Sequence, residues 1–220
     1  MNKTEWKQFE KKYDEIRHEL TIFMDTVESF FANHPKLQLE NKEKIHSTKK
    51  RLKNKKHLKE KIIRKRNSET EINLNNFYSK ITDLSGVRIL LLFQEDFQFI
   101  DDVLREKINN GDWFLAEKGK AYTWDPESEQ YFKKFDLDVS TKSTNYTSVH
   151  YLIKPRSDSP ICCEIQVRTL FEEIWGEVDH RINYPNQTKI SACKEQIRVL
   201  SKIVGAGSRL VDSIQRSIKK

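Results

Sequence analysis

One stretch, residues 161–185, constrains the fold more than any other part of the chain, because its residue pattern changes period half-way along. Apolar and polar residues alternate as far as Arg168, which predicts a half-buried strand with Glu164, Gln166 and Arg168 on its polar face. Apolar residues then recur at every fourth position, which predicts a helix with Thr169 as its N-cap. The stretch is therefore expected to form a strand that leads directly into a helix.

The polar face of this strand carries a carboxylate, an amide and a guanidinium next to the start of a helix. Such convergence at the end of a strand is how many α/β enzymes build a site. The alternative, which this stretch leaves open, is an amphipathic strand and helix with ordinary surface charges. Pro185 marks the end of the predicted helix.

The length and composition favour one folded domain. The chain has 220 residues, of which 36% are hydrophobic and 33% are charged, within the range of folded proteins. No apolar run approaches the roughly 20 residues of a membrane span, and the N-terminal residues lack a signal-peptide core. The cysteines, Cys162, Cys163 and Cys193, match neither a disulfide framework nor a metal-binding spacing. We therefore expect a cytoplasmic protein with reduced cysteines and no membrane partner.

The net charge of +7 is concentrated in one segment. Residues 41–66 contain 13 Lys and Arg against two acidic residues and so carry +11, which leaves −4 for the rest of the chain. Such a basic segment is typical of proteins that bind phosphates, either of a nucleotide or of a nucleic acid. A solvated helix face would have the same composition, and composition does not separate the two.

Periodicity and turn residues place the remaining elements. Helices are expected at 5–31, over the second half of the basic segment, at 96–110, and at 188–219 with a break near Gly205 and Gly207. Strands are expected at 87–93, 113–117, about 135–139 and 149–154, with loops at 68–79, 119–130 and 140–148. The strand at 149–154 and the strand of the opening stretch form a predicted hairpin.

These elements predict an α/β (α+β) fold with a mixed sheet of about five strands flanked by helices. We expect residues 1–220 to form a single domain. Its core would span about residues 45–185, with helical extensions at 1–40 and 186–220.

Two acidic residues, Asp83 and Glu164, stand at the ends of predicted strands. If the fold brings these strands together, the carboxylates would suit Mg²⁺, which usually takes one or two carboxylates plus substrate phosphates. The basic side chains upstream would then hold a triphosphate, as phosphoryl-type transfer needs. The alternative is that each acid is only a helix cap or a surface charge. The common ATP motifs, the P-loop, G-x-G-x-x-G and the kinase signature, are absent.

Four blocks of residues occur in a particular order. They are Arg51-Leu52-Lys53 with Lys61 and Lys65 downstream, Asp83-Leu84-Ser85-Gly86-Val87-Arg88, Tyr146-Thr147-Ser148-Val149-His150, and Glu164-Ile165-Gln166-Val167-Arg168 followed by Trp175 and His180. Together they resemble the synthetase domain of the RelA/SpoT family, the pyrophosphokinases that make (p)ppGpp. The last block is the most specific. No histidine-aspartate hydrolase domain precedes the blocks, so the chain resembles a small synthetase-only member with a nucleotidyltransferase-like fold.

The resemblance implies a reaction, the transfer of the β,γ-pyrophosphate of ATP to a ribose 3′-hydroxyl. It implies that Arg51 and Arg88 sandwich the adenine, because guanidinium planes stack on aromatic rings. It also implies that Lys53 and Lys61 hold the ATP phosphates.

The same resemblance assigns the remaining site residues. It implies that Asp83 and Glu164 bind Mg²⁺ and that Glu164 also acts as general base on the acceptor hydroxyl. Tyr146 would stack on the acceptor base. His150 and Gln166 would orient the acceptor or its phosphates.

Two positions depart from the family pattern. Asn145 stands before the tyrosine where the family usually has glycine, and His57 stands where it usually has serine. Arg168 and His180 match family positions, and we expect them to support the residues that touch the substrates.

The segment after Arg168 resembles the toxic branch of the family, some members of which attach pyrophosphate to the 3′ CCA end of tRNA and are held inactive by an antitoxin. A tRNA acceptor is slightly favoured, because the basic segment suits RNA phosphates. The alternative acceptor is GDP or GTP, which would make (p)ppGpp in the stringent response. A second alternative is a catalytically silent module that binds RNA or a partner. The apolar stripes of the terminal helices would pack on the domain, form a homo-oligomer or bind an antitoxin, and the sequence does not rank these.

Overall fold

The computed structural model describes residues 1–39, 42–67, 71–142, 145–184 and 187–218. Its helices are α1 (Lys3–Asn33), α2 (Lys55–Asn67), α3 (Phe77–Lys80), the 3₁₀ helix η1 (Gln94–Asp96), α4 (Phe97–Asn109), α5 (Pro126–Phe132), α6 (Leu170–Asn183) and α7 (Ser191–Ile218). Its strands are β1 (Gln38–Leu39), β2 (Lys42–Glu43), β3 (Ser47–Leu52), β4 (Ser85–Leu91), β5 (Phe114–Leu115), β6 (Lys120–Tyr122), β7 (Asp138–Ser140), β8 (Ser148–Lys154) and β9 (Cys163–Thr169). Pro185, predicted to end α6, lies outside the described residues.

The predicted mixed sheet is confirmed. Within the described residues it has seven strands rather than about five, in the order β3-β4-β9-β8-β6-β7, with β5 paired to β8. The central neighbours β4 and β9 are parallel, as are β6 and β7, and the other pairs are antiparallel. The predicted hairpin of β8 and β9 is also confirmed.

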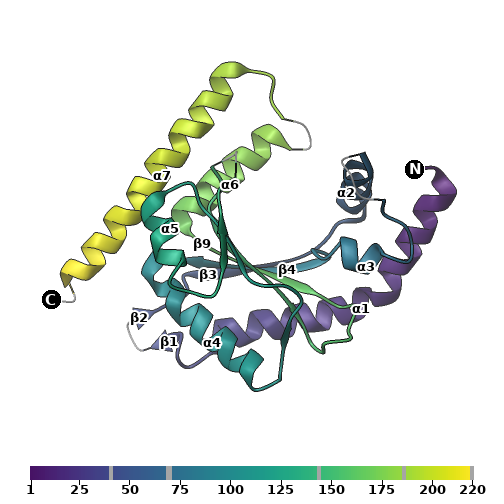
Figure 1. Ribbon diagram of the computed structural model, residues 1–220, viewed down its shortest axis with the longest axis horizontal. Coiled ribbons are helices and arrows are strands. Elements are labelled where there is room, and N and C mark those ends of the chain that lie inside the picture. The colour runs from purple at the N-terminus through teal and green to yellow at the C-terminus, as the bar shows by residue number, and fades with distance from the viewer. Residues whose placement is uncertain (40–41, 68–70, 143–144, 185–186, 219–220) are drawn as a thin grey trace.

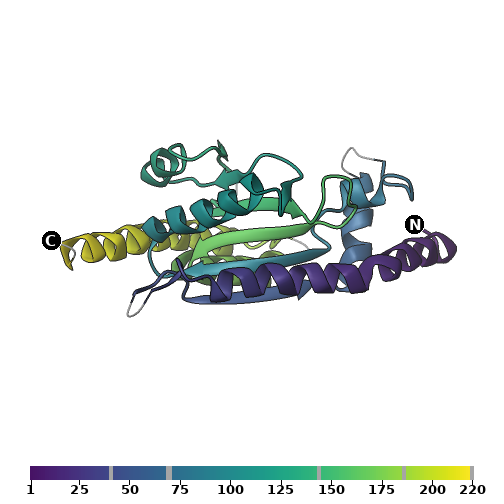
Figure 2. The ribbon, with the colours of Figure 1, turned by 90° about the horizontal axis from the view of Figure 1, so that it is seen from below.

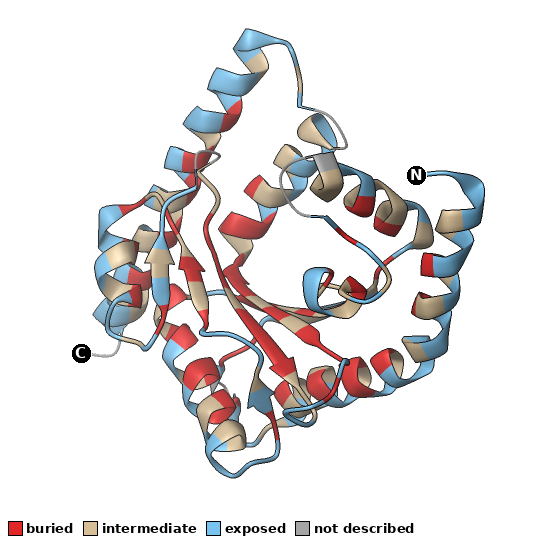
Figure 3. Ribbon diagram, turned by 45° about the vertical axis from the view of Figure 1, so that its right-hand side comes forward, coloured by how far each residue is buried: buried red, intermediate tan, exposed pale blue. Residues whose placement is uncertain are grey.

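Helices cover both faces of the sheet. α1 and α4 lie across one face, and the pair α6 and α7 lies on the other (Figures 1 and 2). Because side chains alternate along a strand, β9 buries Cys163, Ile165 and Val167 in the same hydrophobic cluster as α1 and α4. Its other face turns Glu164 and Gln166 toward the side of α6. Buried residues concentrate on the central strands, whereas the end of α7 that projects beyond the sheet is largely exposed (Figure 3).

The N-terminal helix supplies part of the main core. Asn2 caps α1 by accepting a hydrogen bond from the backbone N–H of Glu5. The buried face of the helix consists of Phe9, Tyr13, Leu20, Phe23, Met24, Val27 and Phe31. The apolar stripe of the N-terminal helix therefore packs on the domain, one of the roles left open by the sequence. Among the described helices, none is both long and apolar enough to cross a membrane.

The basic segment contains the short strand β2 and two longer elements. Its second half forms α2, as predicted, and its first half, for which no element was predicted, forms β3 beside β4. Pairing with a buried strand decides this conformation, because the lysines and arginine of β3 have no intrinsic preference for a strand.

The strand-to-helix unit at β9 and α6 is confirmed. Thr169 and Glu172 form a reciprocal capping box at the start of α6. The buried positions of this helix are Glu172, Glu173 and Trp175. The predicted apolar stripe is exposed at Ile174 and Ile182, so α6 turns carboxylates rather than its aliphatic residues toward the sheet.

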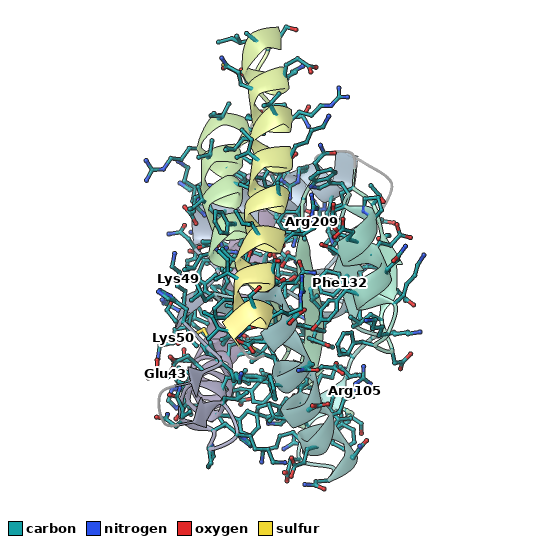
Figure 4. All side chains as sticks on the ribbon, turned by 90° about the vertical axis from the view of Figure 1, so that its left-hand side faces the viewer. Glu43, Lys49, Lys50, Arg105, Phe132 and Arg209 are labelled. Atoms are coloured by element: carbon teal, nitrogen blue, oxygen red, sulfur yellow. The ribbon has the colours of Figure 1, made fainter. Side chains whose placement is uncertain are left out.

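The predicted break in the last helix is wrong, because α7 is continuous through Gly205 and Gly207. A Cβ atom on Gly205 would lie 3.1 Å from the Trp124 ring, and one on Gly207 would lie 2.9 Å from the Phe171 ring. The glycines therefore let two aromatic rings approach the helix closely. Arg209, on the side of α7 that faces α5, forms an ion pair with Asp125 (Figure 4).

The loop predicted at 119–130 is also wrong, because β6 and α5 lie there. Asp125 caps α5 by accepting a hydrogen bond of 3.1 Å from the backbone N–H of Ser128, and Pro126 stands in the first turn. β6 is held by pairing with β8, a long-range contact that a three-residue segment does not reveal in sequence.

Candidate active site

Asp83 lies just before β4 and is held by two lysines. Its Oδ2 atom is 2.7 Å from Nζ of Lys53 and 2.6 Å from Nζ of Lys61. Lys53 follows β3, whose end meets the start of β4, and Lys61 comes from α2. The other carboxylate oxygen, Oδ1, is buried and has no hydrogen-bond partner among the described residues. One oxygen of Asp83 is thus neutralised by cations and the other is left for a ligand.

Glu164 belongs to a closed ring of hydrogen bonds. Its Oε1 is 3.0 Å from Nδ1 of His150, and Nε2 of His150 is 3.0 Å from the hydroxyl of Tyr146. Arg168 donates from Nη2 to the Tyr146 hydroxyl at 2.8 Å and to Oε1 of Gln166 at 2.7 Å. The Gln166 amide closes the ring by donating to Oε2 of Glu164 at 2.7 Å. Four of the site residues predicted from sequence therefore hold one another in place.

The parallel pairing of β4 and β9 brings Asp83 and Glu164 to one cleft. Gly86 pairs with Glu164 in the register, and Asp83 lies three residues before Gly86. A Cβ atom on Gly86 would lie 3.2 Å from the Glu164 carbonyl oxygen, so glycine permits close approach of the strands there. Both acids line a cleft of about 300 Å³, which we call the carboxylate cleft.

Tyr146 is surrounded by cations and an aromatic ring. The guanidinium carbon of Arg168 is 5.2 Å and Nζ of Lys142 is 5.1 Å from the centre of its ring. The ring of Trp175 lies at 6.1 Å. Cations at such distances are attracted to the face of an aromatic ring.

Asn145 has a left-handed backbone with φ of 59°. Asparagine tolerates this conformation better than most residues, which explains how it occupies a position where the family usually has glycine. Its side-chain amide also donates a hydrogen bond of 3.1 Å to Oγ of Ser201 in α7. Asparagine at this position therefore keeps the left-handed backbone conformation, and its side chain connects the residues before Tyr146 to α7.

A buried carboxylate that the sequence did not single out connects three cations. Oε1 of Glu173 in α6 lies 2.8 Å from Nζ of Lys49 and 2.8 Å from Nη1 of Arg88. Its Oε2 lies 3.4 Å from Nη1 of Arg168. In sequence Glu173 is one of two acids in the first turn of a helix, and no local signal reveals that its partners come from three different strands. Arg88 also contacts Glu177 at 3.2 Å.

A larger cavity of about 470 Å³, the central cleft, adjoins the carboxylate cleft. The two clefts share Arg51, Asp83, Arg88, Gln166 and Glu177. Arg51 is exposed on β3, and Arg88 lies on the neighbouring β4. The central cleft is also lined by Lys53, Lys61 and Tyr146.

Aromatic contacts connect α2 to the end of α6 at the far side of the central cleft. The ring of His180 stacks on Tyr184 at 4.6 Å, and His57 meets the same ring edge-on at 5.4 Å. The Tyr184 hydroxyl donates a hydrogen bond of 2.9 Å to Glu60. His57 and His180 therefore support this wall through Tyr184.

The cations keep the two carboxylates ionised. Burial raises the pKa of Asp83, but the charges of Lys61 and Lys53 outweigh it and bring the pKa to about 2. Burial also raises the pKa of Glu164, and the hydrogen bond and charge of His150 outweigh it, so this pKa is lowered. Burial raises the pKa of Tyr146, which keeps it a phenol. The site therefore presents two anionic carboxylates beside lysine and arginine cations.

The donor set fits a Mg²⁺ ion. Asp83 offers a buried oxygen without a partner among the described residues, and Glu164 lines the same cleft. Mg²⁺ is bound in such sites by one or two carboxylates plus substrate phosphates. In the described parts of the chain no three His, Cys, Asp or Glu residues gather into a metal site, so a Mg²⁺ ion here would depend on substrate phosphates.

Comparisons with known proteins agree with this fold. Residues 50–189 match the family described as "Region found in RelA / SpoT proteins". A search of curated proteins gave no match.

Several solved structures have a similar fold. Small alarmone synthetase 1 from Bacillus subtilis is 19% identical, with a TM-score of 0.65 and 97% of each chain covered. A GTP pyrophosphokinase family protein from Streptococcus pneumoniae is 21% identical, with a TM-score of 0.66, 99% of this chain and 96% of that chain covered. The protein smu.1046c from Streptococcus mutans UA159 is 22% identical, with a TM-score of 0.62 and 94% of each chain covered. At these identities the likeness concerns the fold.

Proposed function

Because the chain belongs to the RelA/SpoT family and is a pyrophosphokinase of that type, we propose that it transfers the β,γ-pyrophosphate of ATP to the 3′-hydroxyl of a ribose. The observation that carries this proposal is the carboxylate cleft. Asp83 and Glu164 line it from adjacent parallel strands, and two lysines hold one oxygen of Asp83. We propose that residues 1–220 form a single catalytic domain.

The transfer is a single displacement at the β-phosphorus of ATP. The acceptor 3′-oxygen forms a bond to the β-phosphorus, and the bond from that phosphorus to the oxygen bridging the α- and β-phosphates breaks. AMP leaves with that oxygen, and the acceptor gains a 3′-diphosphate. The proton of the hydroxyl passes to Glu164, which is ionised and hydrogen-bonded at each oxygen by a neighbouring side chain.

The cations of the central cleft support the binding of the ATP. We propose that Lys53 and Lys61 hold the phosphates, since both ammonium groups already meet at one carboxylate oxygen. Arg51 and Arg88 lie on adjacent strands in the wall of the cleft, which supports a shared role on the adenine. Mg²⁺ bound by Asp83 and Glu164 would neutralise charge on the phosphates during the transfer.

We propose that Tyr146 stacks on the acceptor base while His150 and Gln166 orient the acceptor. The hydrogen-bonded ring supports this, because it joins these residues directly to Glu164. An acceptor held by Tyr146 would therefore have its reacting hydroxyl next to the proposed base.

The favoured acceptor is the 3′ CCA end of tRNA, in which case the protein would inhibit translation as the toxin of a toxin-antitoxin pair. The basic segment supports this acceptor, because its lysines and arginines suit RNA phosphates. The alternative acceptor is GDP or GTP, which would make (p)ppGpp. This alternative is supported by a similar structure, 18% identical, of small alarmone synthetase 1 from Bacillus subtilis bound to its product pppGpp. Another structure of that protein, 17% identical to this chain, is bound to AMPCPP, an ATP analogue, which supports ATP as the donor for either acceptor.

The predicted protein partners, an antitoxin or a second copy of the chain, stay predictions. The exposed aliphatic residues that either partner would cover on α7 are Val199, Ile203, Leu210, Ile214 and Ile218.

The test is transfer of label from γ-labelled ATP in the presence of Mg²⁺, with tRNA or GDP as acceptor. Label on the 3′ end of tRNA supports the toxin, and label on guanosine nucleotide alone contradicts it and supports (p)ppGpp synthesis. If the protein, freed of any co-purifying partner, labels neither acceptor, it is a silent binding module and the proposed reaction is wrong.

A further inference from the structure

We propose that a further cavity, on the side of the carboxylates away from α6, binds the polynucleotide strand on the 5′ side of the accepting ribose. The inference rests on the proposed function for the identity of the reacting group. We call this cavity the lysine cleft, after the four lysines in its wall, Lys65, Lys80, Lys120 and Lys154.

The lysine cleft is next to the proposed reacting groups. It has a volume of about 630 Å³, larger than the 470 Å³ of the central cleft. Thr82, directly before Asp83, and Cys162, two residues before Glu164, are part of its wall. A strand lying in it would therefore approach the carboxylates from the amino ends of β4 and β9, while ATP approached from the central cleft.

The charge of this cleft suits a polyanion. Four lysines face two acids, Glu117 and Asp158, so its lining is formally positive. Lys120 is paired with Glu117 at 2.5 Å, and Lys154 makes a 3.5 Å contact to the Ser157 carbonyl oxygen. Lysine binds phosphate as a point charge and reads no base sequence, which favours contact with a nucleic-acid backbone.

One wall of the lysine cleft is connected to Asp83 through α2. Nζ of Lys61, four residues before Lys65 on this helix, lies 2.6 Å from Oδ2 of Asp83, and Nζ of Lys65 donates a hydrogen bond of 2.7 Å to the Lys80 carbonyl oxygen. On this wall, burial lowers the pKa of Lys65, and the neighbouring charges of Lys61 and Lys80 lower it further. Burial also lowers the pKa of Lys142, which lies beside Tyr146 and not in the wall of this cleft, and the charges of Glu164 and Lys120 act on it. A row of cations, Lys61 and Lys65 on α2 and then Lys80, thus leads from Asp83 into the lysine cleft.

The extent of this row favours a polynucleotide over a mononucleotide. A nucleoside diphosphate carries its charge on adjacent phosphates, which a few neighbouring cations would hold. Lysines spread along a second cleft instead match phosphates that continue from one nucleotide to the next. The cleft therefore favours an acceptor that is the end of an RNA strand.

The first test is binding, which needs no catalysis. A fluorescent single-stranded RNA of about ten nucleotides is titrated with the wild-type protein and with the double variant Lys80→Glu/Lys154→Glu, and anisotropy is measured at several salt concentrations. We expect binding to weaken at least about tenfold, and the salt slope to fall by about 1.4 for two lost phosphate contacts. The matched control is Lys7→Glu/Lys11→Glu, which changes the net charge equally at exposed positions on α1. If both double variants weaken binding equally, or neither does, the inference is wrong.

A milder pair, Lys80→Gln/Lys154→Gln, is measured beside the charge reversal, and thermal melting checks that each variant is folded. We expect the glutamine pair to weaken RNA binding in the same direction. Folded glutamine and glutamate variants that bind RNA like the wild-type protein would overturn the assignment.

The second test is label transfer, which distinguishes a cleft that binds the phosphates of an RNA acceptor from one that binds the phosphates of a mononucleotide. We expect Lys80→Glu/Lys154→Glu to lower kcat/KM for an RNA ending in CCA by about tenfold and to change it less than about twofold for GDP. An equal rise in KM for GDP would mean that the cleft holds the phosphates of a mononucleotide, which contradicts the inference. Selective loss of RNA binding in a protein that labels no acceptor would contradict the proposed reaction and keep the lysine cleft as an RNA site.

Discussion

The hydroxyl of Tyr146 and the carboxylate of Glu164 are joined by two separate hydrogen-bonded routes. One route passes through the imidazole of His150, and the other passes through Arg168 and Gln166. When Nδ1 of His150 carries the proton and donates to Glu164, Nε2 accepts from the tyrosine, whose oxygen accepts from Arg168. Each hydrogen bond around the ring then joins a donor to an acceptor, so the proposed acceptor platform and the proposed base hold each other in place.

Glu164→Gln should abolish transfer while leaving the fold intact. The amide keeps the shape of the carboxylate but takes no proton and is a poorer metal ligand, so kcat should fall at least about 10²-fold. Single-turnover transfer of label measures the rate, and a melting temperature close to that of the wild-type protein excludes misfolding. A variant with near wild-type turnover would remove Glu164 from the reaction.

Two substitutions of Tyr146 should separate its ring from its hydroxyl. Tyr146→Ala removes the proposed stacking platform and should raise KM for the acceptor by about 5- to 150-fold, which corresponds to 1–3 kcal/mol for one stacked base. Tyr146→Phe keeps the ring and loses the bonds to His150 and Arg168, so it should lower kcat about tenfold with little change in KM. Steady-state kinetics with varied acceptor measure both. Equal effects of the two changes on KM would contradict a stacking role.

Glu173→Gln should weaken ATP binding. The amide cannot neutralise Lys49, Arg88 and Arg168, so Arg88 should lose its fixed position, and KM for ATP should rise about tenfold. Glu177→Gln is the matched control, because Glu177 is half-exposed and contacts only Arg88 of these cations. An unchanged KM for ATP in Glu173→Gln would show that Glu173 serves stability alone, which thermal melting would record.

Gly176→Ala should reduce activity without reducing stability. A Cβ atom at this position would lie 2.7 Å from Nη1 of Arg168, so the guanidinium must leave its place against Tyr146 and Gln166. Alanine in a helix is favoured over glycine by up to about 1 kcal/mol, which offsets the local crowding. Melting temperature and kcat are compared with those of Arg168→Ala. The double variant should lose no more activity than the worse single variant, and additive losses would place Gly176 outside this contact.

Glu172→Gln should remove part of the pH dependence of stability. Burial raises the pKa of Glu172 from 4.5 to about 7 in the folded protein. Between these pH values the folded state holds more protons than the unfolded state, so stability falls as the pH rises. The loss is up to about 3 kcal/mol for a shift of this size. Glutamine keeps the capping position and does not titrate.

The measurement for Glu172 is the melting temperature of the wild-type protein and the variant from pH 4.5 to 8. We expect the variant to become the more stable of the two as the pH approaches 7 and above. Asp212, whose pKa burial raises to about 6, titrates in both proteins, and its charge is one of the causes that raise the pKa of Glu172. Parallel curves for the two proteins would show that Glu172 does not titrate in this range.

The local pattern of the chain determined the elements that carry a strong signal of their own. The alternation before Arg168, the capping residues at Thr169 and Glu172, and the apolar run of β4 each specify a conformation through nearby residues. The order of the four blocks also identified the family, because motif residues are visible without the fold.

Tertiary structure alone decided what long-range contacts control. β3 and β6 form because neighbouring strands pair with them, and α7 continues through its glycines because Trp124 and Phe171 pack there. Glu173 looked like a first-turn acid, and only the arrangement of three strands under α6 places three cations around it. The pairing of Asp83 with Glu164 likewise depends on the parallel register of β4 and β9. The sequence shows which side chains the chain contains. The free energy of packing and pairing distant segments decides which of these side chains come into contact.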